Sequence, residues 1–187
     1  MKWGMSSWRQ DFAENSWLKN IGDAQANALE KTANPKPAKG DYPAMTTGKT
    51  DAKEILHERL ALAFAKPYKE MTVEAKDFFV NPDQYIIVNY ADEAVYNHGH
   101  IKKAVHYTPF KSLSDAEDLS SLPTDKKIVV YDNAGFIAAH AVAYLNLLGY
   151  DVANLAYGNN SFMNKEMVKM GWDGFSAKEI GMNPVVE

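Results

Sequence analysis

The residues best placed to do chemistry lie at the junction of a predicted strand and a predicted helix. Residues 127–131 (KIVVY) are apolar and β-branched, as in a buried strand, and residues 135–148 have the apolar spacing of a helix. Asp132 follows that strand directly, where a carboxylate could act as a nucleophile. A phosphoryl-accepting role is disfavoured, because the residue two positions further on is Ala134 rather than an acid and no lysine follows in the loop.

Histidines are the other residues whose chemistry could matter. His98, His100 and His106 lie close together, but the first two point the same way only in a strand. No acidic residue falls at a useful spacing from them, so we expect no metal site. His140 lies early in the predicted helix and is expected to be a packed or capping residue rather than a base paired with Asp132.

The chain contains no cysteine among its 187 residues. This excludes disulfides, thiolate zinc sites, iron–sulfur clusters and cysteine nucleophiles, and we expect no cofactor. Its 24 acidic and 20 basic residues leave a net charge of −4, so nothing indicates a nucleic-acid partner. No stretch of about twenty apolar residues is present, so no transmembrane segment is expected.

The composition is compatible with more than one cellular compartment. Hydrophobic residues make up 46% and charged residues 24% of the chain, which is typical of a soluble globular protein. Residues 1–8 lack the apolar core of a signal peptide. The cysteine-free composition and a long connector rich in proline and lysine are compatible with an exported, periplasmic bacterial protein.

The first third of the chain has weak secondary-structure patterns. Residues 23–32 could form a short helix, and the prolines that follow predict an extended connector over residues 33–50. A helix is predicted over residues 51–65, with Asp51 as its N-cap and Pro67 just beyond its end.

From residue 71 onward, helices and strands alternate. This alternation predicts a parallel sheet that is covered on both faces. The predicted helices span residues 72–80 (capped by Thr72), 92–96, 135–148 and 161–170, and the predicted strands span residues 85–88, 104–106, 127–131 and 152–155.

Three segments in this part resemble the rhodanese-like family. Residues 97–104 (NHGHIKKA) resemble its Gly-His-Ile-x-x-Ala signature, residues 122–131 the approach to its active-site loop, and residues 145–158 the segment after it. The resemblance covers roughly residues 71–162. It implies an α/β fold with a central parallel five-stranded sheet flanked by helices on both faces and preceded by an N-terminal extension. It also implies that the signature residues Gly99, His100 and Ile101 are structural.

The resemblance places the family's active-site loop, typically Cys-x-x-Gly-x-Arg-Ser, after the strand at residues 127–131. Only Gly135 matches that pattern, because Asp132 stands at the nucleophile position, Ile137 at the arginine position and Ala138 at the serine position. The degenerate loop comprises Asp132, Asn133, Ala134, Gly135, Phe136, Ile137 and Ala138.

An aspartate cannot replace the cysteine in sulfur transfer, because a carboxylate oxygen has no stable persulfide counterpart. We therefore expect a catalytically inactive domain. Two positions for Asp132 remain open. Its carboxylate either accepts hydrogen bonds from the N–H groups of its own loop and fills the anion site, or it is exposed at the strand end. Five aromatic residues could line the mouth of the pocket or pack in the core, namely Tyr90, Tyr96, Tyr107, Tyr131 and Phe136.

An eight-residue repeat bears on the domain organisation. Residues 1–8 (MKWGMSSW) are similar to residues 155–162 (LAYGNNSF), at an offset of 154 residues. One interpretation is that residues 1–8 are the tail of a preceding rhodanese-like domain, and the other is an accidental match. We divide the chain into an N-terminal segment and connector, residues 1–50, and a rhodanese-like domain, residues 51–187.

The N-terminal segment is rich in aromatic residues without a complete amphipathic element. Its Trp3, Trp8, Phe12 and Trp17 must pack on the same chain, on a second copy or on a protein partner. Two functions follow from these patterns. One is an inactive rhodanese-like domain that serves in binding or assembly. The alternative is the non-catalytic half of a tandem sulfurtransferase, whose active cysteine lies in an absent first domain. A changed enzyme that uses Asp132 is a third and weaker hypothesis.

Overall fold

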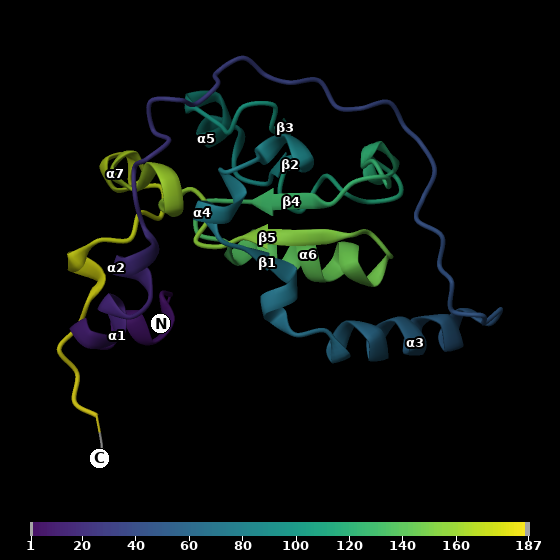
Figure 1. Cartoon of the computed structure of the whole chain (residues 1–187), viewed down its shortest axis with the longest axis horizontal. Coiled ribbons are helices and arrows are strands. Elements are labelled where there is room, and N and C mark those ends of the chain that lie inside the picture. The colour runs from purple at the N-terminus through teal and green to yellow at the C-terminus, as the bar shows by residue number, and fades with distance from the viewer. Residues whose placement is uncertain (1, 186–187) are drawn as a thin grey trace.

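A parallel five-stranded sheet forms the centre of the molecule in the computed structural model, which describes residues 2–185 (Figure 1). The strands follow one another in the order β1-β5-β4-β2-β3, and every neighbouring pair is parallel. This confirms the predicted fold class. The strands are β1 (Thr72–Val73), β2 (Ile86–Asn89), β3 (Val105–His106), β4 (Ile128–Tyr131) and β5 (Val152–Leu155).

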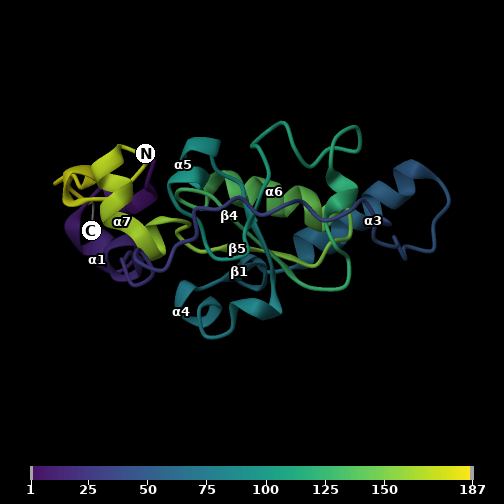
Figure 2. The same cartoon turned by 90° about the horizontal axis from the view of Figure 1, so that it is seen from above.

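Helices cover both faces of this sheet, because its central strands are apolar on both sides. One face packs against α6 (Phe136–Leu147), and the other packs against α4 (Ala75–Phe78) and α7 (Asn160–Met170). Figure 2 shows α6 and α4 on opposite sides of the strands. The sheet residues on the α6 face include Val88, Ile128, Val130 and Val152, and those on the opposite face include Ile87, Val129, Tyr131 and Leu155.

Two helices lie at the edges of this core. The short α5 (Glu93–His98) connects β2 to β3, and α3 (Ala52–Ala65) lies beside α6. Asp51 caps α3 as predicted, since its carboxylate accepts the N–H groups of Lys53 and Glu54 at 3.0 and 3.1 Å. No residue of α3 is fully buried, and Phe64 is 85% exposed. Short 3-10 turns span Gly4–Ser7, Tyr68–Met71, Pro82–Gln84, Leu119–Ser121 and Ala177–Glu179.

Two helix predictions differ from the structure, because residues 72–80 are helical only in part and residues 23–32 are not helical. Residues 72–80 begin instead as strand β1, where Val73 accepts a hydrogen bond from Ala156 of the chain beyond β5, and only residues 75–78 are helical. A two-residue strand is too short to show a strand's periodicity. The helix predicted over residues 23–32 is also absent, since Glu30 exchanges both backbone hydrogen bonds with His100, at 2.8 and 2.9 Å, rather than with its own turn.

The predicted connector over residues 33–50 is confirmed as a segment without helix or strand, apart from a single bridge between Asn34 and Val105. It arcs across the molecule from the N-terminal helices to α3 (Figure 1). Gly40 donates a backbone hydrogen bond of 2.7 Å to Ser120 along the way. Within residues 2–185, no helix is both long and apolar enough to cross a bilayer.

The N-terminal segment packs on the same chain. Its helices α1 (Gln10–Glu14) and α2 (Trp17–Asn20) lie beside the C-terminal segment (Figure 1). Trp3 and Trp17, 3% and 6% exposed, meet edge to face with ring centroids 4.6 Å apart, and both pack on Phe175. For Trp3 and Trp17, the structure therefore confirms the alternative of packing on the same chain. Trp8 and Phe12 remain partly exposed.

Replacing the central aromatic residue of this cluster tests the packing. Trp17→Ala is expected to lower the free energy of unfolding by about 3–5 kcal/mol, because it removes a large buried side chain. Urea unfolding followed by circular dichroism measures the change. Met5→Ala is the control in the same segment, because Met5 is 51% exposed and its truncation should change stability little. Equal stability of W17A and the parent protein would contradict the packing.

Candidate functional site

The loop between β4 and α6 closes around the carboxylate of Asp132. This side chain is 3% exposed and accepts four backbone hydrogen bonds. Its Oδ1 accepts the N–H groups of Ala134, at 2.8 Å, and Gly135, and its Oδ2 accepts those of Ile137 and Ala138 at 2.6 and 3.1 Å. The prediction that Asp132 fills its own loop is confirmed, and the alternative of an exposed side chain is wrong.

Helix α6 explains why the amides converge on this point. The first N–H groups of a helix have no partner inside the helix and carry its partial positive charge. Gly135, the residue at the helix start, has no side chain with which to cap them, and it adopts a φ of +86°, which suits glycine. Asp132 supplies the missing cap from three residues further back.

Residues 158–160, which follow β5, pack against the loop and form hydrogen bonds with it. The N–H of Asn159 donates to the carbonyl oxygen of Asp132 at 2.8 Å, and the side-chain amide of Asn160 donates to the carbonyl oxygen of Asn133 at 2.7 Å. A Cβ at Gly158 would clash with the Asp132 carbonyl oxygen and with the amide nitrogen of Ala134, which lies 2.9 Å from that position. The close approach therefore requires glycine at residue 158.

Asn159 and Asn160, which hold the loop, were not among the residues predicted from the sequence. Both are fully buried. Two consecutive asparagines after Gly158 are the sequence feature that could have pointed to them, because buried amides need hydrogen-bond partners.

The electrostatics of the loop oppose a second anion. Burial raises the pKa of Asp132, and the N–H donors of Gly135, Ala138, Ala134 and Ile137 act in the opposite direction. All four hydrogen bonds of its carboxylate come from N–H donors, which is the geometry that suits the ionised form. The backbone N–H groups of the loop therefore already donate to the two carboxylate oxygens of Asp132.

The signature residues lie on the other side of the sheet from α6, near the β2–β3 connection. His100 is fully buried, its Nδ1 lies 2.8 Å from the carbonyl oxygen of Tyr96, and the two rings stack with centroids 3.8 Å apart. Gly99 is buried beside Leu29, and a Cβ there would lie 3.1 Å from the Leu29 side chain. Ile101 is also buried, in the core on the α4 face.

The other three histidines considered from the sequence do not come together as a metal centre. His98 lies 3.4 Å from Glu166, His106 bonds the carbonyl oxygen of Ala91 at 2.9 Å, and His140 is exposed on α6. Within residues 2–185, no three histidine or carboxylate side chains converge in a way that could hold a metal ion.

Four of the five aromatic residues considered for the pocket mouth lie in the interior instead. The hydroxyl of Tyr131 accepts the N–H of Ile101 at 3.1 Å, and that of Tyr107 lies 2.7 Å from Ser121. Burial raises the pKa of Tyr107 to about 12. Tyr90 and Tyr96 are likewise buried, so for these four residues the alternative of packing in the core is confirmed. Only Phe136, 46% exposed, stands at the outside of the loop.

Phe136 lines a cavity of about 300 Å³ at the carboxyl ends of β1 and β5, where ligands commonly bind in open α/β sheets. Trp17 from the N-terminal segment and Glu74 after β1 also line it. Neither residue was predicted to lie near the loop, because Trp17 and Glu74 are far from it in sequence. The lining includes Ser16, Trp17, Tyr68, Glu74, Phe136, Asn154 and Tyr157.

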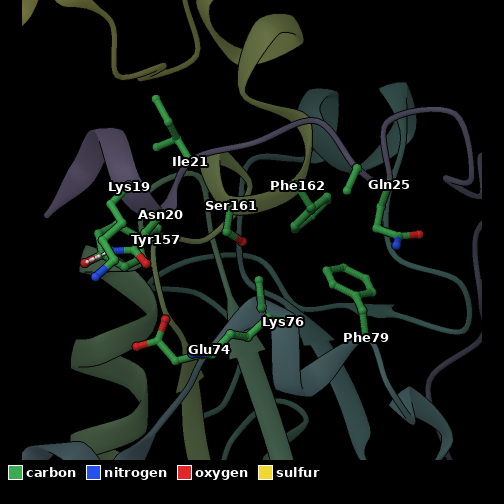
Figure 3. A pocket seen from close by; sticks show the side chains of 12 residues that line it. Lys19, Asn20, Ile21, Gln25, Glu74, Lys76, Phe79, Tyr157, Ser161 and Phe162 are labelled. Atoms are coloured by element: carbon green, nitrogen blue, oxygen red, sulfur yellow. Dashed lines mark hydrogen bonds between the residues drawn. The ribbon is translucent and has the colours of Figure 1, made fainter. Parts of the chain in front are cut away.

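An adjoining cavity of about 330 Å³ shares Glu74 and Tyr157 with the first (Figure 3). Asn20 donates a hydrogen bond of 3.0 Å to the Tyr157 hydroxyl at its wall. Lys19 and Lys76 line this second cavity but not the first. The two cavities meet at Tyr157, but lysine side chains line only the second.

The sheet order and the position of the amide-lined loop after the central strand define an α/β domain with a parallel sheet covered by helices on both faces. The sequence model of the rhodanese-like domain matches residues 72–165, half of the chain. The chain belongs to the rhodanese-like domain family. That residues 132–138 correspond to the family's active-site loop stays a prediction.

Solved structures with this likeness are distant in sequence. A rhodanese-related protein from Thermoplasma volcanium is 24% identical, with a TM-score of 0.43, and the match covers 49% of this chain and 88% of that one. A rhodanese-like domain protein from Staphylococcus aureus is 19% identical, with a TM-score of 0.43, and the match covers 49% of this chain and 89% of that one. Reduced CoADR-RHD from Bacillus anthracis is 18% identical (TM-score 0.46; 86% of this chain and 26% of that one). No curated protein sequence matches this chain.

Replacing the carboxylate by an amide tests the four hydrogen bonds. Asp132→Asn keeps the shape but turns one accepting oxygen into a donor, so two of the four N–H groups lose their partner. We expect the free energy of unfolding to fall by at least about 2 kcal/mol, because each unsatisfied buried donor costs about 1–3 kcal/mol. Urea unfolding measures the loss.

Asp125→Asn is the matched control, because Asp125 is exposed on the loop before β4 and makes none of the side-chain hydrogen bonds described for residues 2–185. Its stability should equal that of the parent protein. A D132N protein as stable as D125N would show that the carboxylate does not hold the loop.

Proposed function

We propose that this rhodanese-like domain does not transfer sulfur and serves as a binding or structural module. The observation that carries the proposal is the Asp132 carboxylate hydrogen-bonded inside its own loop. Sulfur transfer in this family, as the resemblance implies, needs a thiolate that accepts a sulfur atom as a persulfide. An oxygen nucleophile has no equivalent stable product, and the negative carboxylate repels an incoming anionic donor.

The rest of the loop offers no substitute for the cysteine. Residues 133–138 contain no hydroxyl, thiol or amine side chain, and Ile137 stands at the position expected for arginine. Attack by Asp132 itself is disfavoured because its side chain is 3% exposed and its two oxygens are bonded to backbone amides. These features support a domain retained for contacts rather than for catalysis.

Contact with a protein partner or with a second copy belongs to the same proposal. Trp8 and Phe12 are the aromatic residues of the N-terminal segment that remain partly exposed. Arg9 lies over the ring of Phe12, with its guanidinium carbon 5.2 Å from the ring centroid. An aromatic surface beside an arginine has the composition of a protein contact surface.

The tandem organisation is a second candidate, supported by the local geometry of the repeat. Gly4 and Gly158 both have a positive φ, +59° and +52°. Gly4 begins the turn Gly4–Ser7, and Gly158 lies two residues before α7. Trp3 and Tyr157, the preceding residues of each copy, both pack edge to face on Trp17. Met1 lies outside the described residues.

In this candidate function, the division into residues 1–50 and 51–187 separates a domain tail and connector from the rhodanese-like domain. The chain is then the non-catalytic half of a tandem sulfurtransferase. The genomic sequence preceding Met1 tests it. An encoded domain with Cys-x-x-Gly-x-Arg supports it, and the absence of such a domain contradicts it.

Loss of sulfur transfer is tested directly with thiosulfate as donor and cyanide as acceptor. The protein is expected to form no thiocyanate above a protein-free blank, because no sulfur nucleophile is present. The Asp132→Ala variant is the control for contaminating enzymes and should give the same background. Turnover that increases with protein concentration and disappears in D132A would overturn the proposal.

The amide cradle itself is tested by placing a thiol in it. Because the chain has no cysteine, Asp132→Cys carries a single thiol, whose ionisation can be followed by the ultraviolet absorbance of the thiolate. The four N–H donors are expected to lower its pKa below the usual value of about 8.5. The control is Thr124→Cys on an exposed loop, expected to titrate near that usual value. A pKa in D132C equal to or above that in T124C would contradict a cradle for anions.

A further inference from the structure

The cavity outside the loop has the opposite character to an anion site. Its lining includes four aromatic residues, and Glu74 is the only charged residue among those that line it. No lysine, arginine or histidine of residues 2–185 is part of this lining. The four aromatic residues are Trp17, Tyr68, Phe136 and Tyr157.

The aromatic rings form a corner rather than a flat stack. Trp17 meets Tyr157 edge to face, with centroids 4.9 Å apart and planes at 89°, and lies 5.9 Å from Phe136 at 61°. Phe136 and Tyr68 are 46% and 61% exposed, so their rings are accessible from solvent. Aromatic faces carry negative potential, so the accessible rings of Phe136 and Tyr68 can attract a cation that lies against them.

One carboxylate adds to that potential. The carboxylate of Glu74 is exposed and takes part in none of the ion pairs found within residues 2–185. Asn154, which is 2% exposed, belongs to the cavity wall. Its amide nitrogen donates to the carbonyl oxygen of Gly135 at 3.0 Å and to the Tyr68 hydroxyl at 3.4 Å, so this side chain holds Tyr68 against the loop.

We propose that this cavity binds the alkylammonium group of a small organic cation such as choline. Aromatic rings with one carboxylate are the chemistry that recognises such groups, because they offer cation–π attraction and an opposite charge without demanding N–H donors. The volume of about 300 Å³ lies at the lower end of the range for small-ligand sites. Asp132 takes no part, so the inference does not depend on the lost sulfur transfer.

The adjoining cavity serves as an internal comparison. It shares Glu74 and Tyr157, but Lys19 and Lys76 line it, and their charges oppose a cation (Figure 3). Its further aromatic residues, Phe79 and Phe162, lie on the side of this cavity away from Glu74 and Tyr157. The cation is therefore assigned to the cavity beside Phe136, where no basic side chain contributes.

The test compares choline with 3,3-dimethylbutan-1-ol, which has the same shape without the charge. Titration of the full chain is followed by the indole N–H resonance of Trp17, assigned with a Trp17→Phe variant. Choline is expected to shift this resonance and to bind roughly 2- to 30-fold more tightly than the neutral alcohol, the range of a cation–π contact. Equal affinity for the two probes, or no shift with either, would overturn the proposal.

Matched variants locate the site. Glu74→Gln and Phe136→Leu should each weaken choline binding several-fold, whereas Glu70→Gln and Phe110→Leu should leave it unchanged, because Glu70 and Phe110 are exposed and line neither cavity. Unchanged binding in both E74Q and F136L would refute the assignment.

Phosphatidylcholine vesicles distinguish the source of the group. If the protein sediments with the vesicles but does not bind free choline, the bound group is a lipid headgroup rather than a small molecule.

Discussion

One buried carboxylate ties together the strand end, the loop and the helix start at the centre of the molecule. Asp132 ties the end of β4 to the first turn of α6 through four amide hydrogen bonds, and its own carbonyl oxygen accepts the N–H of Asn159 after β5. The same residue thus connects two strand ends and a helix start. Its negative charge is offset by oriented amides and the helix dipole rather than by a positively charged side chain.

The surroundings of this loop carry two opposite kinds of chemistry within a short distance. Inside the loop, amide hydrogens point at one position that suits an anion, and Asp132 occupies it. Outside the loop, aromatic rings and Glu74 surround a space that suits a cation. Phe136 belongs to both parts, since its backbone starts α6 and its side chain faces the outer cavity.

The elements that were predicted correctly are those with long, continuous apolar patterns. Strand β4 and helix α6 are fully recognisable in the sequence, and the resemblance supplied the count of five strands. Strand β1 was missed because two residues carry no periodicity, and its pairing with β5 is a long-range contact. The apolar residues of α3 indicated a helix but not its burial, since Phe64 faces solvent.

The site was predictable only in part. The position of Asp132 followed from the family pattern, but its inward orientation depends on the φ of Gly135 and on the asparagines of another segment. The cavity beside Phe136 was beyond sequence reasoning, because its walls come from three distant parts of the chain and Trp17 reaches it only through tertiary packing.

Holding its own anion gives the loop a thermodynamic property that a ligand-filled loop lacks. A protein that binds an external anion gains stability with the anion's concentration, by mass action. Here the occupying carboxylate belongs to the chain, so its effective concentration is constant and independent of the solution. The β4–α6 junction therefore keeps the same order whether sulfate and phosphate are scarce or abundant around it.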